Sequence, residues 1–289
     1  GVQTCALPIS QFHGYYDHYC YLPLYVFCGQ AMLACVLRPS RIDGAKQAAA
    51  VIKLLVTRLR QAWPQVRLIV RGDSGFCRQR LIRWCERRSV GYVIGVARNA
   101  RLHRHVEAWE QELESAFVRE GIKQRMIREF RYAADSWNIE RRVVTRLEYG
   151  SQGTNPRFVV TSLTDPSPEA LYRDLYCARG QDENFIKAMK NDLASDRTAD
   201  HAFLANHLRL FYACAAYQLI HSLRENTLCH TELARAQPMS IILKLFKLAV
   251  RVVQYKDRIK LHLPSTCAVK GLLHRVTELL FLAYPPLTT

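Results

Sequence analysis

The stretch RLIVRGDSGFCR, residues 67–78, combines an apolar run with a carboxylate at its end. Leu68, Ile69 and Val70 have the side chains of a buried strand, and Asp73 follows shortly after them. Open α/β sheets bind their ligands beyond the carboxyl ends of their strands, so this position suits a functional side chain. An Asp that precedes Ser and Gly is, however, most often a turn former. The surrounding sequence must therefore be used to distinguish between a turn-forming role and a functional role for Asp73.

The charge around Asp73 favours a site. Residues 67–104 contain ten arginines but only two acids, Asp73 and Glu86. The chain of 289 residues has a formal net charge of +16, from 41 Lys and Arg against 25 Asp and Glu. Such a surplus indicates a polyanionic partner, although a basic solvated surface or a subunit on ribosomal RNA would share it. We therefore interpret Asp73 as the ligand of a cation within a basic groove.

Composition narrows the class of protein. The ten cysteines are scattered without a C-x-x-C pair, a pattern typical of reduced thiols in a cytoplasmic protein. No uninterrupted apolar run is long enough to span a membrane. The sequence therefore predicts a cytoplasmic protein that contacts no membrane.

The hydrophobic pattern predicts a mixed α/β fold in which helices cover a sheet. Two β-rich runs flank Gly29 and Gln30 and predict a hairpin with a two-residue turn. Asp43 is expected to cap the helix that follows it. The strand before Asp73 and the segment 91–97 continue the predicted sheet.

Beyond residue 101 the pattern of charged and apolar residues changes. Residues 102–165, with alternating, Arg-containing segments, are expected to form a β-rich insertion after the last sheet strand. Residues 166–225 return to the core that residues 11–101 begin, and residues 226–289 are expected to form a helical C-terminal region. Helices are predicted over residues 168–195, 199–224, 240–259 and 268–282.

The segment YCARGQDENFIKAMK, residues 176–190, supplies a second candidate carboxylate. Five polar side chains fall on one face of the helix predicted here, at spacings of 3, 4, 4 and 3: Tyr176, Arg179, Glu183, Lys187 and Lys190. A solvated face with a Glu183–Lys187 ion pair is the plain alternative. Two carboxylates from separate elements of a cation-rich chain suit a Mg²⁺ site that acts on nucleic-acid phosphates.

The run Tyr176-x2-Arg179-x3-Glu183-x6-Lys190 resembles the Y-R-E-K signature of a large group of bacterial insertion-sequence transposases, position for position. These are DDE enzymes with a ribonuclease-H-like fold. The segments that look like further blocks of the same group are residues 12–29, 70–102 and 196–219. The resemblance covers most of residues 11–285.

The resemblance implies a role for each matched residue. Asp73 and Glu183 would be the second and third catalytic carboxylates and would bind Mg²⁺, or Mn²⁺ in its place. The residues implied to contact DNA phosphates near the transposon end are Tyr176, Arg179, Lys190 and, as a weaker candidate, Lys187. In relatives the insertion can supply an aromatic that stacks on a flipped base; Trp137 is the candidate here, and an ordinary packed tryptophan is the alternative.

The first catalytic aspartate of the group has no match. Its expected position is shortly before the FHGYY block, where residues 1–10, GVQTCALPIS, resemble a translated sequencing-library adapter. The only acids upstream of Asp73 are Asp17, which has no strand of its own before it, and Asp43. We expect residues 1–10 to be an adapter scar on an N-terminally truncated chain, with an ordinary N-terminal segment as the alternative.

The resemblance thus implies an α/β, ribonuclease-H-like mixed sheet flanked by helices, with a β-rich insertion and a helical C-terminal region. It implies a DDE transposase catalytic fragment, bacterial and nucleoid-associated, that acts as a dimer on double-stranded DNA, at terminal inverted repeats and target DNA. Without the first aspartate, we expect this chain to be inactive. The alternatives are another ribonuclease-H-like nuclease, which would cut without preference for inverted repeats, and a non-enzymatic DNA-binding remnant.

Overall fold

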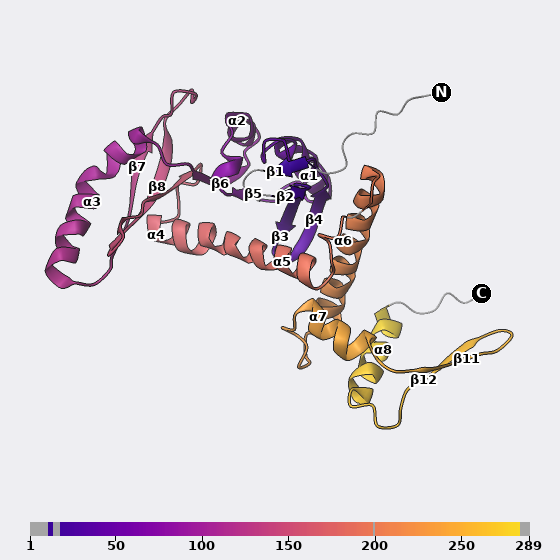
Figure 1. Cartoon of the computed structure of the whole chain (residues 1–289). Helices are drawn as coiled ribbons and strands as arrows, with labels where there is room; N and C mark the ends of the chain where they lie inside the picture. The colour runs from indigo at the N-terminus through magenta and orange to yellow at the C-terminus, as the bar shows by residue number, and fades with distance from the viewer. Residues whose placement is uncertain (1–10, 14–17, 199, 284–289) are drawn as a thin grey trace, which may run out of the picture. The chain divides into compact units, whose positions relative to one another are not determined.

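The computed structural model describes residues 11–13, 18–198 and 200–283, and Figure 1 labels their helices and strands. Two features of the sequence, the predicted adapter scar at residues 1–10 and the acid Asp17, lie outside the described residues.

The chain forms two compact units, which are described separately. One unit is Arg41–Gln181. The other combines Gly1–Ser40 with Asp182–Thr289.

A mixed sheet forms the centre of the unit Arg41–Gln181. Its strands, in spatial order, are β5 (Ile69–Gly72), β6 (Gly91–Val96), β10 (Arg157–Thr161), β8 (Arg141–Gly150) and β7 (Gln124–Tyr132), with β9 (Gly153–Thr154) paired to β8. β5 and β6 are parallel, and every other pair is antiparallel. The mixed sheet flanked by helices confirms the predicted fold class. The prediction that β6 would be the last strand of this sheet is wrong, because β10 pairs with it.

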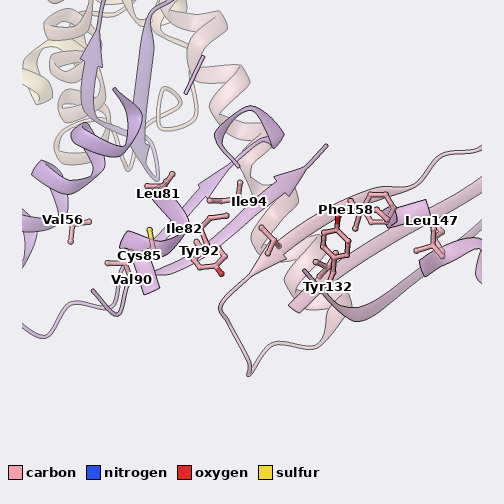
Figure 2. Close-up of a cluster of buried hydrophobic side chains, with 14 of the residues drawn as sticks. Val56, Leu81, Ile82, Cys85, Val90, Tyr92, Ile94, Tyr132, Leu147 and Phe158 are labelled. Atoms are coloured by element: carbon pink, nitrogen blue, oxygen red, sulfur yellow. The ribbon is translucent and has the colours of Figure 1, made fainter. Parts of the chain in front are cut away.

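One face of the sheet packs against three helices. These are α1 (Ala48–Ala62), α2 (Gln79–Arg87) and α3 (Ala100–Glu120). Figure 2 shows part of the shared core, in which Ile82 of α2 and Tyr92 of β6 are almost fully buried. Figure 1 shows α3 running beside β7 and β8. Each large apolar side chain buried here contributes about 2 kcal/mol, so this core stabilises the strand that ends at the candidate site.

The opposite face of the sheet packs against the chain that follows β10. Side chains alternate along a strand, so Phe158 of β10 joins the first core, whereas the next residue, Val159, joins a second core on the opposite face. The segment that covers this face is built from α4 (Pro168–Ala170), the π-helical η2 (Leu171–Tyr176) and the 3₁₀-helical η3 (Cys177–Arg179). Ser167 begins it by accepting a hydrogen bond from the Ala170 amide at 3.2 Å.

The second unit is built on a hairpin and two helices. Strands β3 (Leu24–Cys28) and β4 (Ala31–Val36) meet at Gly29, whose φ of 56° fits the predicted two-residue turn. Among the described strands, β3 and β4 pair with each other. The hairpin packs on α5 (Gly180–Asn191) and α6 (Phe203–Asn226). Strands β1 (Gln11–His13) and β2 (His18–Cys20) form a further pair.

The C-terminal region is only partly helical. Its elements are α7 (Pro238–Ile241), the π-helical η4 (Ile242–Phe246), β11 (Arg251–Gln254), β12 (Ile259–His262) and α8 (Lys270–Ala283). The helix predicted over residues 240–259 is therefore wrong beyond Phe246, since β11 and β12 form an antiparallel hairpin there. Across the described part of the chain, no helix has an apolar stretch sufficient to cross a bilayer.

Candidate active site

Asp73 stands directly after β5, at the carboxyl end of the strand. Its Oδ1 accepts a hydrogen bond from the Gly75 amide at 2.8 Å and so caps the short 3₁₀ helix η1 (Ser74–Phe76). A Cβ on Gly75 would lie 2.9 Å from this oxygen, so the glycine lets the turn close around the carboxylate. Asp73 is therefore both a turn former and a half-buried carboxylate at a strand end. The two interpretations of the sequence do not exclude each other.

The second acid of the Arg-rich segment is neutralised within the fold. Glu86 accepts hydrogen bonds from Arg141 Nε at 2.6 Å and Arg141 Nη2 at 2.9 Å, and a third from the Tyr92 hydroxyl at 2.8 Å. No comparable ion pair with Asp73 is found among the described residues. Of the two acids in the segment, only Asp73 keeps a carboxylate available to a cation.

Asp43 does not cap a helix, contrary to the prediction. Helix α1 begins five residues later, with Gln47 at its N-cap. The Asp43 carboxylate instead accepts the Ala45 amide at 3.0 Å and forms a two-pronged ion pair with Arg78, at 2.8 and 3.1 Å. These contacts hold the segment before α1 against the start of α2.

Tyr176 and the Asp73 turn both lie close to Gly95. A Cβ placed on Gly95 of β6 would lie 2.6 Å from the Tyr176 hydroxyl oxygen and 2.9 Å from the Ser74 nitrogen. The hydroxyl and the turn therefore both border the space that a side chain on Gly95 would occupy. Arg179 lies over the Tyr176 ring, with its guanidinium carbon 5.7 Å from the ring centroid.

The electrostatics agree with this arrangement. Burial raises the pKa of Tyr176 above its ordinary value, and the negative charge of Asp73 raises it further. The guanidinium groups of Arg179 and Arg157 oppose the shift. Arg157 was not singled out from the sequence. It stands first in β10, and only the pairing of β10 with β6 brings it to the end of the sheet where Asp73 lies.

The remaining signature residues lie on α5. Glu183, Lys187 and Lys190 are exposed, while Met189 is fully buried in the core of the second unit. Regular α-helical geometry begins only at Gly180, because the π-helical η2 and the 3₁₀-helical η3 precede it. Spacing along one helical face therefore relates Glu183, Lys187 and Lys190 to each other, but does not extend back to Tyr176. Asp73 and Glu183 belong to different units, and their approach to one another is part of the function proposed below.

The comparison with protein families supplies the context for this geometry. Residues 7–284 match the family described as transposase DDE domain group 1. The chain belongs to this family of DDE transposase domains. The comparison with individual curated proteins gave no match. The family as a whole implies an enzyme that cleaves and transfers DNA with the help of divalent metal ions.

The donor chemistry of Asp73 suits a divalent metal ion, but the described residues do not complete a site. Within the described residues, no three His, Cys, Asp or Glu side chains gather closely enough to hold an ion. Asp73 nevertheless offers the hard oxygen donors that Mg²⁺ and Mn²⁺ prefer, and the Gly75 amide orients its carboxylate. The residues fit such an ion in kind, and a second carboxylate is required to hold it.

Trp137 of the transposase domain has the contacts of a packed side chain. Its ring meets the Tyr132 ring edge-on at 5.5 Å, and the Arg141 guanidinium carbon lies 5.0 Å from its centroid. The residue is half-buried against the first core. These contacts fit the plain alternative, and stacking on a DNA base stays a prediction.

Proposed function

We propose that this chain is the catalytic domain of an insertion-sequence transposase of the Y-R-E-K group, which cuts and joins DNA at terminal inverted repeats. The observation that carries the proposal is the group formed at the end of β5. There Asp73, not neutralised by any basic side chain of the described residues, is close enough to Tyr176 to raise its pKa, and Arg179 lies over the Tyr176 ring. A strand-end carboxylate next to two signature residues is what such a catalytic centre requires.

Asp73 and Glu183 are proposed to hold the divalent ions, Mg²⁺ or Mn²⁺. When bound, such ions neutralise the charge that develops at the scissile phosphorus and activate a nucleophilic oxygen. The protein's own contribution is to hold the DNA backbone in place. Arg179 is suited to a phosphate because its planar guanidinium can donate two parallel hydrogen bonds. Lys187 and Lys190 add charge on the exposed side of α5.

Among the described residues, none is proposed as the first carboxylate of a DDE cluster. Asp43 is engaged by Arg78, and Asp17 lies outside the described residues. We therefore propose that the chain as it stands binds double-stranded DNA, as a dimer on transposon ends and target, without cutting it.

The proposal can be tested without catalytic turnover by iron-directed cleavage. Fe²⁺ takes the place of Mg²⁺ at a carboxylate site and, with ascorbate and peroxide, cuts the nearby polypeptide. We expect two cuts, one near Asp73 and one near Glu183. Both should be lost in Asp73→Ala and in Glu183→Ala, because the two residues share the ion.

The matched control is Asp135→Ala, which removes an exposed acid from the loop that carries Trp137. It should leave both cuts in place. A single cut near Asp73 that survives Glu183→Ala would contradict the shared site and favour a DNA-binding remnant.

A further inference from the structure

Gly95 occupies the tightest position near Asp73. A Cβ there would lie 2.6 Å from the Tyr176 hydroxyl oxygen, 2.9 Å from the Ser74 nitrogen and 3.2 Å from the Asp73 carbonyl carbon. Real Cβ atoms essentially never come within 3.0 Å of another group. The absence of a side chain at Gly95 is thus what allows both the Tyr176 hydroxyl and the Asp73 turn to lie this close to β6.

Tyr176 is held firmly in this position. Its ring is half-buried and lies 5.5 Å from the Tyr172 ring, which is itself buried. Beneath it, residues Tyr92 to Gly95 of β6 form a fully buried strand. On its near side, the Arg71 guanidinium donates a hydrogen bond to the Leu175 carbonyl at 3.1 Å and so ties β5 to η2. The hydroxyl is therefore fixed relative to the strand that ends at Asp73.

We propose that Gly95 and Tyr176 are positioning residues. Because Gly95 has no side chain, the Tyr176 hydroxyl has room to support the Asp73–Ser74 peptide. This support sets the direction of the Asp73 carboxylate. The proposal rests on the proposed function only for the role of Asp73. It departs from the sequence-based expectation that Tyr176 contacts DNA phosphate. In this proposal Tyr176 contacts the protein backbone next to Asp73, and Arg179, not Tyr176, contacts the DNA phosphate.

The state of the turn can be measured by amide hydrogen exchange in the protein without metal or DNA. Three amides are hydrogen-bonded within it: Gly75 to Asp73 Oδ1 at 2.8 Å, Phe76 to the Asp73 carbonyl at 3.1 Å and Cys77 to the Ser74 carbonyl at 3.3 Å. Exchange of these amides reports on how well the turn is formed. The variants are Gly95→Ala, Tyr176→Phe and the double variant.

We expect Gly95→Ala to speed exchange of the three amides about tenfold, because a methyl group must displace the hydroxyl or the turn. Tyr176→Phe should speed it about threefold, because the ring stays but the supporting oxygen is lost. The double variant should exchange more slowly than Gly95→Ala, because the closest clashing atom is gone. It should not reach the wild-type rate, since the clash with Ser74 remains.

Two controls separate this effect from general loosening. Tyr172→Phe removes the hydroxyl of the neighbouring tyrosine, and Gly271→Ala adds a methyl group where no atom lies within 4 Å apart from the adjacent residues and the backbone of its own helix. Both should leave the three exchange rates unchanged. The proposal is overturned if Gly95→Ala matches the wild type, or if the double variant exchanges as fast as Gly95→Ala.

If Gly95→Ala does not fold, Tyr176→Phe decides alone, and unchanged exchange in that variant overturns the proposal. DNA binding gives a second readout. A phosphate contact by the Tyr176 hydroxyl would reduce the affinity for DNA in Tyr176→Phe, whereas a positioning role leaves that affinity unchanged. Failure of the iron-directed cleavage would count against the shared metal site and would leave these exchange rates as they are.

Discussion

Arg141 and Glu86 form a two-pronged ion pair, with Nε to Oε1 at 2.6 Å and Nη2 to Oε2 at 2.9 Å. Arg141 is 3% exposed and stacks on Trp137, so the pair joins β8 to α2 inside the first core. Glu86 and Asp73 are the two acids of the same Arg-rich segment, residues 67–104. Their roles in the structure differ, because Glu86 stabilises the fold through Arg141, whereas Asp73 lies at the candidate site.

The ion pair predicts a large effect of Glu86→Gln on stability. Removing the carboxylate leaves the buried Arg141 charge uncompensated, which typically costs about 3 kcal/mol of unfolding free energy. Urea unfolding at neutral pH measures this loss. Glu107→Gln, which changes an exposed acid on α3, should shift the unfolding free energy by under about 0.5 kcal/mol. Equal effects of the two substitutions would contradict the structural role.

The same pair predicts a dependence of stability on acid pH. Burial alone would raise the pKa of Glu86, but the hydrogen bonds from Arg141 and Tyr92 outweigh it and hold the pKa below 4.5. Because the folded pKa lies below the unfolded one, the stabilisation is complete above about pH 4.5 and is lost as the pH falls through the folded pKa. The difference in unfolding free energy between wild type and Glu86→Gln should therefore shrink below pH 4.5. A constant difference down to strongly acid pH would contradict this account.

The basic residues of the proposed DNA interface predict a salt-dependent interaction with DNA. Each lost phosphate contact should reduce the slope of log K against log salt concentration by about 0.9. We expect this change for Arg179→Ala, Lys190→Ala and Arg157→Ala, measured by fluorescence anisotropy on a random duplex. Arg87→Ala is the control, because Arg87 ends α2 beside the start of β6, at the other end of the sheet. The interface is misplaced if Arg87→Ala changes the slope as much as the other three.

Trp137 offers a choice between packing and base stacking. Loss of its contacts with Tyr132 and Arg141 in Trp137→Ala should lower the unfolding free energy by about 2 kcal/mol, somewhat less than for a fully buried ring. Trp137→Phe should recover about half of this. Affinity for a duplex with one unpaired base separates the two roles. A loss of that affinity in Trp137→Phe, with stability kept, would favour stacking on DNA.

The strands and helices around Asp73 could be predicted because their signals are local. The apolar run before Asp73 and the Gly29 turn depend on neighbouring residues alone, and both lie where the sequence indicated. The order of the sheet could not be predicted, because pairing of β10 with β6 joins residues more than sixty positions apart. Arg157 and Gly95 were missed for the same reason.

Two errors had a different origin. The helix predicted over residues 240–259 followed an apolar helical period that ends at Phe246, after which alternating residues form β11 and β12. The signature was treated as one regular helix, whereas its first two residues lie in π- and 3₁₀-helical turns. In π- and 3₁₀-helical turns the backbone hydrogen bonds span one residue more or one residue fewer than in an α-helix, and this difference does not clearly change the hydrophobic pattern of the sequence.

The most direct test of the proposed function is diffraction from Mn²⁺-soaked crystals of this chain, recorded at the manganese absorption edge. The account predicts an anomalous peak between Asp73 and Glu183, about 2.2 Å from a carboxylate oxygen of each. A peak bound by neither residue, or carboxyl groups on opposite sides of the molecule, would contradict it.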